Sequence, residues 1–485
     1  MQRLGTWWRT EGGGRELLRL ALPLILSNSF WTLQITIDSI FLAWLSGDAV
    51  SAGFVTSLLF WTPLSVFWAT AAYSSTFVAQ YVGAGRPRRV GPAVWQALYF
   101  SVLTGLAFLV MVPLAGPVCA LVDHPRPVQE LEVIFLRCLA FTALPTLITN
   151  AVCGFFSGRG DSWTVLAING VGLVVNALLD YALIFGHGGF PAWGIAGAGW
   201  ATVTGSSASA VVGLLLLFRL RYRREFATTS GWRPERDLFA RLIRFGLPSG
   251  LPLLIDGIAF TAFTVVVGWI GTTQLTSTTI AFRINLVAFL PMLGLAQAVS
   301  VLVGQRLGED RPDVAERTTW SGCGLACLYM TTVSVLYVLR PEWFLNPFRG
   351  DDVSQWDEVA VLVPTLLYFV AVYSLLDGIN LVLSFALRGG GDTRFVTLVP
   401  LTLLFPLMVL PTYAAYHFGW GLYGAWAFAS LYIMGQALVF LVRFRGGRWK
   451  SMRVIEAAPV IEEPPPERPA GGWVEEVACS EGGAE

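Results

Sequence analysis

The stretch RLALP (19–23) recurs 225 residues later as RFGLP (244–248). Further matches keep this offset or one close to it: Gln80 with Gln305, Gly83 with Gly308, Trp44 with Trp269, SGRGDS (157–162) with RGGGDT (388–393), and WGIAGA (193–198) with WGLYGA (420–425). An offset that nearly holds through loops as well as apolar segments indicates an internal repeat. The sequence therefore predicts two halves of the same fold, joined by a charged connector.

The composition is that of a membrane protein. Of 485 residues, 55% are hydrophobic and 13% are charged, and the mean hydropathy is +0.62. Apolar stretches of about twenty residues recur along the chain, and each is long enough to cross a hydrocarbon core of ~30 Å as a helix. They are continuously apolar rather than alternating, which favours helices over a β-barrel. A net charge of zero argues against a nucleic-acid partner.

These stretches predict an all-α polytopic membrane protein with twelve transmembrane helices, in two pseudo-symmetric six-helix lobes around a central cavity. The expected spans are 17–46, 52–82, 91–115, 129–156, 163–186, 196–219, 246–270, 276–305, 315–338, 358–387, 394–416 and 423–445. The expected divisions are a cytoplasmic N-terminus (1–16), an N-terminal lobe (17–219), a cytoplasmic connector (220–245), a C-terminal lobe (246–445) and a disordered cytoplasmic tail (446–485). Because one chain supplies both lobes, we expect a monomer.

The distribution of positive charge predicts the orientation. If the N-terminus is cytoplasmic, nearly all of the 32 Arg and Lys residues lie in the termini, in cytoplasmic loops or at the span ends that border them. The exceptions are Arg126, Arg340 and Arg349 on the other side, and Arg137 and Arg283 within spans. Because cytoplasmic loops carry an excess of such residues, we expect a multi-pass protein of the plasma (inner) membrane with both termini in the cytoplasm.

Four carboxylates are predicted to lie inside the membrane, two in each half: Asp38, Asp180, Asp256 and Asp377. A charged side chain at the bilayer centre costs about 2.5 kcal/mol or more, so such residues usually face a cavity and take part in binding or transport. The alternative is a protonated acid that only packs one helix on another. That alternative explains a single Asp better than four divided evenly between the halves.

In the N-terminal half the acids have oxygen-bearing neighbours. Asn176 and Asp180 are four residues apart and therefore face one side of a helix. Asp38 lies on the first span, and Thr202, near the start of the sixth, adds a hydroxyl. Two carboxylates, an amide and a hydroxyl form an all-oxygen set of the kind that hard cations prefer. We expect this set to bind either Na⁺ or a proton shared by the carboxylates.

The acids of the C-terminal half have a more aromatic setting. Tyr373 and Asp377 are again four residues apart, and Asp256 stands on another span. Carboxylates beside ring faces suit a proton or an organic cation. We expect no cofactor besides the coupling ion, Na⁺ or H⁺.

The chain resembles the multidrug and toxic compound extrusion (MATE) family of secondary transporters over roughly residues 15–445. The segments that carry the resemblance are IDSIFLAWLSGD (37–48), SGRGDS, NALLDYALIFG (176–186), GIAGAGWAT (194–202), VLVGQRLG (301–308) and RGGGDT. The resemblance implies a secondary active antiporter that exports cationic amphipathic compounds in exchange for Na⁺ or H⁺ by alternating access. Its partners would be small organic cations and the lipid bilayer.

The resemblance also implies roles for individual residues. The N-terminal-lobe cation site of the family matches Asp38, Asn176, Asp180 and Thr202, and its C-terminal-lobe tyrosine and aspartate match Tyr373 and Asp377. Asp256 departs from the family pattern, because many members carry a glutamate there. The shorter side chain keeps a carboxylate at this position.

The sequence also bears on three other functions. An ATP-driven pump would need a Walker A lysine, and the only lysine, Lys450, lies in GGRWKS, so this chain contains no ATPase domain. GRGD (158–161) and GGGD (389–392) share the GxGD motif of intramembrane aspartyl proteases, but we expect their aspartates to cap the following helices, and no enzyme is predicted. A lipid-linked saccharide flippase of the same superfamily often carries a cationic cavity, whereas the intramembrane charges here are mainly acidic.

Overall fold

The structure is a computed structural model that describes residues 7–8, 10–122, 124–349 and 356–457. Within these residues, twelve helical segments are long and apolar enough to cross a membrane, which confirms the predicted all-α polytopic fold. The first six are α2 (Gly14–Leu45), α3 with α4 (Gly47–Ala72, Ser74–Gly83), α5 with α6 (Val90–Ala107, Met111–Ala120), α7 (Arg126–Gly158), α8 (Ser162–Phe185) and α9 (Ile195–Leu217). The second six are α11 (Arg236–Ile270), α12 (Thr272–Gly308), α13 (Pro312–Leu339), α15 (Trp356–Gly390), α16 with α17 (Thr393–Leu403, Leu410–His417) and α18 (Gly421–Arg445).

Polar side chains and glycine set several helix ends. Ser46 accepts a hydrogen bond from the Ala49 N–H at the start of α3. Asp161 caps α8 as predicted, because its carboxylate accepts from both the backbone N–H and the hydroxyl of Thr164. Gly186, in the left-handed region at φ +77°, ends the same helix.

The capping prediction is wrong for Asp392, which precedes α16 and makes no side-chain cap. Its carboxylate instead accepts a hydrogen bond from Arg443 Nε of α18 at 2.7 Å. The distant arginine takes the carboxylate because α18 passes beside the start of α16.

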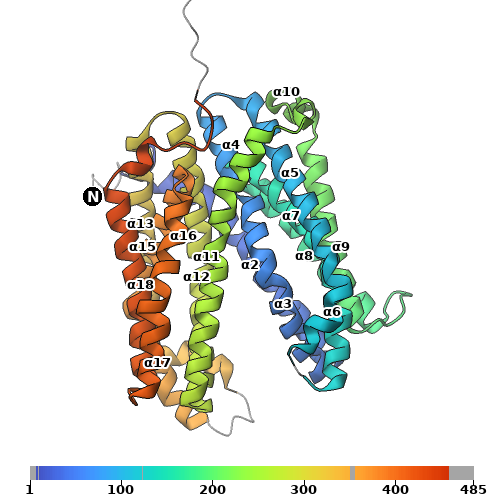
Figure 1. The fold of residues 1–485 in the computed structure, drawn as a ribbon, viewed down its shortest axis with the longest axis vertical. Coiled ribbons are helices and arrows are strands. Elements are labelled where there is room, and N and C mark those ends of the chain that lie inside the picture. The colour runs from blue at the N-terminus through green and yellow to red at the C-terminus, as the bar shows by residue number, and fades with distance from the viewer. Residues whose placement is uncertain (1–6, 9, 123, 350–355, 458–485) are drawn as a thin grey trace, which may run out of the picture. The chain divides into compact units, whose positions relative to one another are not determined.

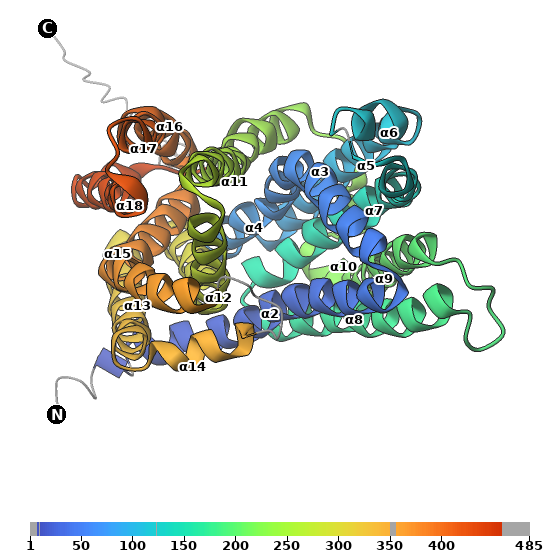
Figure 2. The same ribbon diagram turned by 90° about the horizontal axis from the view of Figure 1, so that it is seen from below.

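The two halves form two helical bundles. α2 packs on α8 in the first bundle, and α11 packs on α16 in the second. The two bundles also contact each other. α2 packs along α12, and α11 packs along α3. Figure 1 shows the two bundles meeting at the end that carries α10 (Leu220–Phe226), and their ribbons diverge toward α6 and α17. Figure 2 shows α2 running from beside α13 to beside α8. These ends are called the α10 end and the α17 end below.

The repeat is expressed directly in the contact between the bundles. Gln80 Nε2 donates to the carbonyl of Gly389 at 3.0 Å, and its repeat equivalent Gln305 donates to the carbonyl of Gly158 at 2.8 Å. Gly158 and Gly389 themselves occupy matching positions in SGRGDS and RGGGDT. The two glutamines therefore make the same hydrogen bond from opposite halves.

Two glycines allow this close approach. A Cβ at Gly83 would lie 2.0 Å from the carbonyl oxygen of Gln305, and a Cβ at Gly308 would lie 2.3 Å from that of Gln80. Neither distance leaves room for a side chain. We call the contact made by Gln80, Gln305, Gly83 and Gly308 the paired-glutamine joint.

The structure differs from the expected divisions in the connector. α11 begins at Arg236, well before the expected span at 246, so the last part of the connector is already helical. Apolar residues continue the buried face of α11 into this part, with Leu238 and Leu242 both buried. The charged residues Arg236, Asp237 and Arg244 that flank them are exposed.

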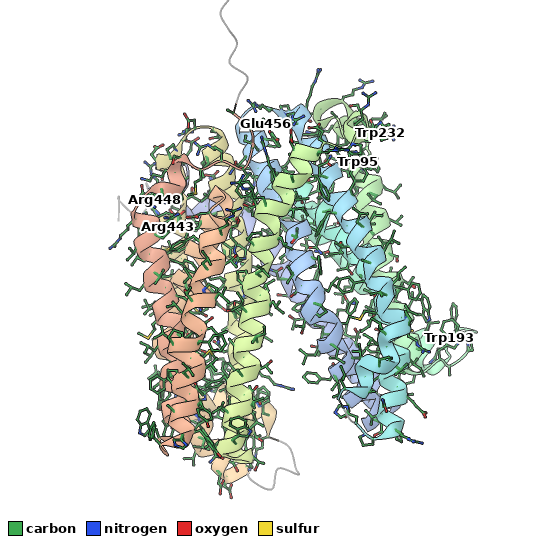
Figure 3. All side chains as sticks on the ribbon, viewed as in Figure 1. Trp95, Trp193, Trp232, Arg443, Arg448 and Glu456 are labelled. Carbon is green, nitrogen blue, oxygen red and sulfur yellow. The ribbon has the colours of Figure 1, made fainter. Side chains whose placement is uncertain are left out.

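The prediction of a disordered tail from 446 is wrong for its first residues. The chain turns after α18 and forms a short 3₁₀ helix, Arg448–Ser451, in which Trp449 is completely buried. Figure 3 labels Arg443 and Arg448 on either side of this turn, at the α10 end. Trp449 and Val454 supply this buried surface. The composition of the whole tail, which is mainly polar, does not reveal it. The rest of the predicted disordered tail, 458–485, lies outside the described residues.

Candidate functional site

The N-terminal bundle has a polar stripe where α2 and α8 pack together. Asn169 Nδ2 donates to Ser27 Oγ at 2.6 Å. The same separation of 142 residues relates Asp38 of α2 to Asp180 of α8, so the two helices stay in register from one polar pair to the next. The side chains of Asp38 and Asp180 lie close enough to interact, and Asn176 interacts with both.

This cluster contains buried polar atoms that lack hydrogen bonds. Asp38 Oδ1, both carboxylate oxygens of Asp180 and both amide atoms of Asn176 are buried without a partner. Asn176 and Asp180 are completely buried, whereas the rest of Asp38 is half-buried. An unsatisfied buried polar group costs about 1–3 kcal/mol, and native proteins rarely keep several together. A cation, or protons on the carboxylates, would satisfy these oxygens, so the residues fit a cation site.

Thr202, the fourth residue predicted for this site, makes a different contact. Its hydroxyl donates to the carbonyl of Ala198, one turn earlier on α9. α9 nevertheless packs closely on α8, which carries Asn176 and Asp180. A Cβ at Gly205 of α9 would lie 2.8 Å from the Cβ of Asn176. The structure thus brings three of the four predicted residues together and leaves Thr202 hydrogen-bonded within its own helix.

The predicted residues of the C-terminal bundle also come together. Asp256 of α11 interacts with Asp377 of α15, and Asp377 interacts with Tyr373 on the preceding turn. Asn285 of α12 donates to the Tyr373 hydroxyl at 3.4 Å. Tyr373 is buried, whereas Asp256 is exposed on the surface of its bundle. This cluster is therefore more open than the one between α2 and α8.

The two clusters are not copies of each other, although the bundles are. At the 225-residue offset, Asp38 corresponds to Phe263, which is buried in the apolar core of the second bundle. In the same way, Asp256 corresponds to the exposed Trp31. One acid of each bundle therefore stands where the other bundle has an aromatic side chain, so the two clusters have different surroundings and different chemistry.

Sequence reasoning missed two members of the second cluster. Tyr432 of α18 is buried and interacts with Asp256, and its hydroxyl has no hydrogen-bond partner. Arg388, near the end of α15, also interacts with Asp256, and its Nε is buried without a partner. Both residues lie at least eleven positions from Asp256 and Asp377 in the sequence, so the sequence offers no local signal for their place in this cluster.

A further buried acid, Glu132 of α7, was missed because it lies near the start of an expected span, 129–156. The side chain is completely buried, and one carboxylate oxygen lies 2.7 Å from His124 Nδ1. With histidine as a partner, this carboxylate differs from the clusters between helices. This contact lies where α7 begins.

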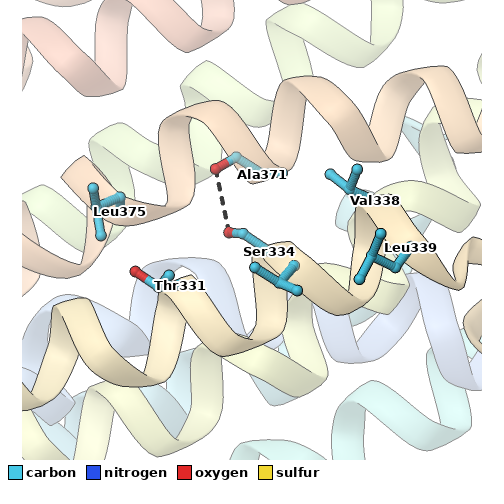
Figure 4. A pocket seen from close by; sticks show the side chains of 7 residues that line it. Thr331, Ser334, Val338, Leu339, Ala371 and Leu375 are labelled. Atoms are coloured by element: carbon cyan, nitrogen blue, oxygen red, sulfur yellow. Dashed lines mark hydrogen bonds between the residues drawn. The ribbon is translucent and has the colours of Figure 1, made fainter.

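An apolar groove of about 360 Å³ lies between α13 and α15 (Figure 4). Ser334, which lines the groove, donates to the carbonyl of Ala371, and Leu375 also lines it. Leu375 precedes Asp377 by two residues, which places the two side chains on nearly opposite sides of α15. The groove is therefore separate from the acidic cluster.

Comparison with known proteins places this arrangement in a family. The MatE family model matches residues 23–182 and 248–414, one segment in each half. A probable multidrug resistance protein NorM of Xylella fastidiosa is 29% identical over 442 residues, covering 89% of this chain and 91% of its own length. The protein of the same description from Brucella suis is 27% identical over 440 residues, covering 89% and 93%.

Solved structures share the fold. An outward-facing multidrug resistance MATE family transporter of the MOP superfamily matches with a TM-score of 0.81 at 22% identity, covering 92% of this chain and 98% of that one. A MOP superfamily transporter from Pyrococcus furiosus, reported to have a binding pocket of reversed polarity, matches with a TM-score of 0.82 at 21% identity and the same coverage.

Repeated six-helix bundles with carboxylates between membrane helices are typical of membrane transporters. The chain belongs to the MatE family, whose members are transporters and not enzymes. The protease alternative is thereby excluded, and the two GxGD aspartates have structural contacts instead, Asp161 as a helix cap and Asp392 with Arg443.

Proposed function

We propose that this transporter exports cationic, amphipathic compounds in exchange for Na⁺ or H⁺, by alternating access. The relatives named above are multidrug resistance proteins, which supports multidrug efflux as the activity. The acids at the bundle surfaces and interfaces favour a positively charged substrate, because opposite charges steer and select binding partners.

The observation that carries the proposal is the set of unpartnered buried oxygens on Asp38 and Asp180. Two interacting carboxylates repel each other when both are charged, and a cation bound between them would offset that repulsion. Asn176 adds an amide oxygen to the same site. In this proposal the cluster between α2 and α8 binds the coupling ion.

α2 connects that ion site to the contact between the bundles. Asp38 lies in its second half, packed on α8, whereas Asn28 lies in its first half and donates to Gln297 of α12 at 3.3 Å. Pro23 removes one backbone hydrogen bond from this helix and eases bending. Ion binding that draws Asp38 toward Asp180 would bend α2 and so shift the first bundle against the second.

We propose that the cluster of Asp256, Tyr373 and Asp377 binds the substrate. Asp256 is exposed, and Tyr373 and Tyr432 bring aromatic rings beside the carboxylates. An organic cation gains both ion pairing and ring contacts in such a place. Arg388, which interacts with Asp256, would keep part of this negative charge balanced when no substrate is bound.

The energy of ion exchange limits the stoichiometry. A membrane potential of about 100 mV contributes roughly 2.3 kcal/mol per charge, and a tenfold ion gradient adds about 1.4 kcal/mol. Exchange of one inward cation for one outward monovalent cation cancels the voltage contribution. Strong accumulation therefore requires two coupling ions or a neutral substrate.

The proposed location is the inner membrane, with the α10 end and both termini in the cytoplasm. The arginine-rich helix α10, with Arg221, Arg223 and Arg224, supports this orientation by the positive-inside rule. A monomer is sufficient for the proposed cycle, since one chain carries both clusters.

The experiment reconstitutes the protein in liposomes and follows a fluorescent organic cation under an imposed Na⁺ gradient, and then under a pH gradient without Na⁺. The variants are Asp180→Asn and, as a matched control, Asp48→Asn, which changes an exposed carboxylate at the start of α3. We expect ion-driven transport in the wild type and in Asp48→Asn, and its loss in Asp180→Asn. No cation transport under either gradient would reject the proposal in favour of a lipid-linked saccharide flippase.

A further inference from the structure

The residues after α18 fold back across the α10 end. Gly447, in the left-handed region at φ +71°, reverses the chain. Trp449 then becomes completely buried, donates its Nε1–H to the carbonyl of Phe444 at 2.9 Å and stacks on the ring of Phe444 at 4.7 Å. A buried indole fixes the position of this segment, which we call the strap (residues 448–454).

Two ion pairs tie the strap to the second bundle. Lys450 Nζ lies 2.6 Å from Glu316 Oε2 on α13, and Arg453 Nη2 lies 2.9 Å from Asp310 Oδ1 in the turn before α13. Together with the buried Trp449, these contacts make the strap part of the second bundle.

The strap ends on the first bundle. The Val454 N–H donates to Gln80 Oε1 at 2.9 Å, and this hydrogen bond is buried. Gln80 uses its other amide atom, Nε2, to bond Gly389. One side chain of the first bundle therefore bonds two separate segments of the second, so the strap reinforces the paired-glutamine joint.

We infer that the strap holds the bundles together at the α10 end through Gln80, and that it must leave Gln80 before they separate there. This inference rests on the proposed alternating-access function, in which the α10 end opens once in each cycle. The strap has several contacts with the second bundle, and among the described hydrogen bonds the one from the Val454 N–H to Gln80 Oε1 joins it to the first. That hydrogen bond is the one that breaks on opening, and the strap travels with the second bundle.

The strap breaks the symmetry of the joint. Gln305 makes the equivalent bond to Gly158, but among the described hydrogen bonds the strap engages Gln80. Separation of the bundles at the α10 end therefore requires the strap to leave Gln80, whereas Gln305 has no such requirement among the described hydrogen bonds. Any partner or modification that pulls the strap away would favour the state open at the α10 end.

The test measures how often this joint opens, without substrate or ion gradient. Thr76 of α4 is 3% exposed and lies beside Gly304 of α12, so a cysteine there is shielded while the bundles touch. Thr76→Cys is made in an otherwise cysteine-free protein in nanodiscs, and its rate of labelling by a thiol reagent is recorded. Val454→Pro removes the N–H that bonds Gln80.

We expect Val454→Pro to raise the labelling rate about fivefold, the factor given by one net hydrogen bond. In a Gln80→Leu background, Val454→Pro should add nothing further, because the acceptor is gone. In the matched Gln305→Leu background it should still raise labelling about fivefold. Arg453→Gln removes the ion pair with the exposed Asp310 and so loosens the strap, and it should also raise the labelling rate. This variant replaces Val454→Pro if the proline variant fails to fold.

Unchanged labelling in both strap variants would overturn the inference, and so would a full effect of Val454→Pro in the Gln80→Leu background. The measurement is separate from the proposed function, because labelling needs no transport. If Asp180→Asn retained ion-driven export, the ion site would be rejected while the strap result would stand.

Discussion

Gln80 and Gln305, which the repeat relates, each donate a side-chain hydrogen bond to a backbone carbonyl of the opposite bundle. The contact is reciprocal because each recipient glycine, Gly389 or Gly158, is itself a repeat equivalent of the other. The two bundles are therefore held together at the α10 end by two equivalent hydrogen bonds.

Replacing either glutamine by leucine should weaken the joint. Gln80→Leu or Gln305→Leu leaves a backbone carbonyl without its partner, at a cost of about 1–3 kcal/mol. We expect the equilibrium to shift toward the state in which the bundles separate at the α10 end and approach at the α17 end. Spin labels at Leu121 and Phe418, both highly exposed near the α17 end, would report this as a larger population of shorter distances. An unchanged distance distribution in both variants would show that the glutamines do not hold this state.

The glycines of the joint should tolerate no side chain. Gly83→Ala and Gly308→Ala place a Cβ 2.0 and 2.3 Å from a carbonyl oxygen, so closing the joint requires a backbone shift. Overpacking of this kind typically costs about 1–3 kcal/mol. Gly324→Ala in α13 is the matched control, because a Cβ there meets nothing within 4 Å. We expect the same spin-label shift in the first two variants and none in the control. Equal behaviour of all three would contradict the close approach.

The ion pair of Asp392 and Arg443 should contribute strongly to stability. The Asp392 side chain is 6% exposed, and removing its partner leaves a buried charge, which costs about 3–5 kcal/mol. We expect Arg443→Leu to lower the free energy of unfolding by about that amount, and Asp392→Asn in the same chain to restore most of it. Arg448→Leu, at a nearby exposed position, is the control. A loss in Arg443→Leu no larger than in the control would show that the pair is dispensable.

The contact between the N-terminal segment and the second bundle should depend on pH. Arg311 donates to Glu11 at 2.6 Å, and this hydrogen bond and the arginine charge lower the pKa of Glu11 below its ordinary value of 4.5. A lowered pKa in the folded state means that the interaction is complete above about pH 4.5 and is lost as the pH falls through the lowered value. Amide exchange of residues 10–13, corrected for its intrinsic pH dependence, should therefore rise only below pH 4.5. The step should vanish in Arg311→Gln, and its persistence there would assign it to another group.

Much of the fold can be predicted from the sequence, because a bilayer leaves few alternatives to long apolar helices. The repeat likewise predicts which segments correspond, including Gln80 with Gln305. The hydrogen bonds of these glutamines could not be predicted, because they cross between bundles whose relative placement no local pattern encodes.

The candidate site shows the same division. The pairing of Asn176 with Asp180 follows from helical spacing, and its approach to Asp38 required only that the first and fifth spans be neighbours. Tyr432 lies far along the chain from the acid with which it interacts, so only the packing of α18 near α11 reveals it. Trp449 was hidden because a charged, proline-rich tail dominates the composition around it.

Ion binding to the purified protein tests the central claim most directly. Saturable binding of radioactive Na⁺ is measured across a range of pH, together with proton uptake on acidification in the absence of Na⁺. Wild type is compared with Asp38→Asn and Asp180→Asn, and with Asp256→Asn and Asp377→Asn as matched carboxylate variants of the other bundle. We predict that the first two variants lose the Na⁺ site or, for a proton-coupled protein, the corresponding proton uptake, while the last two retain it. Full ion binding in Asp38→Asn and Asp180→Asn would contradict the account.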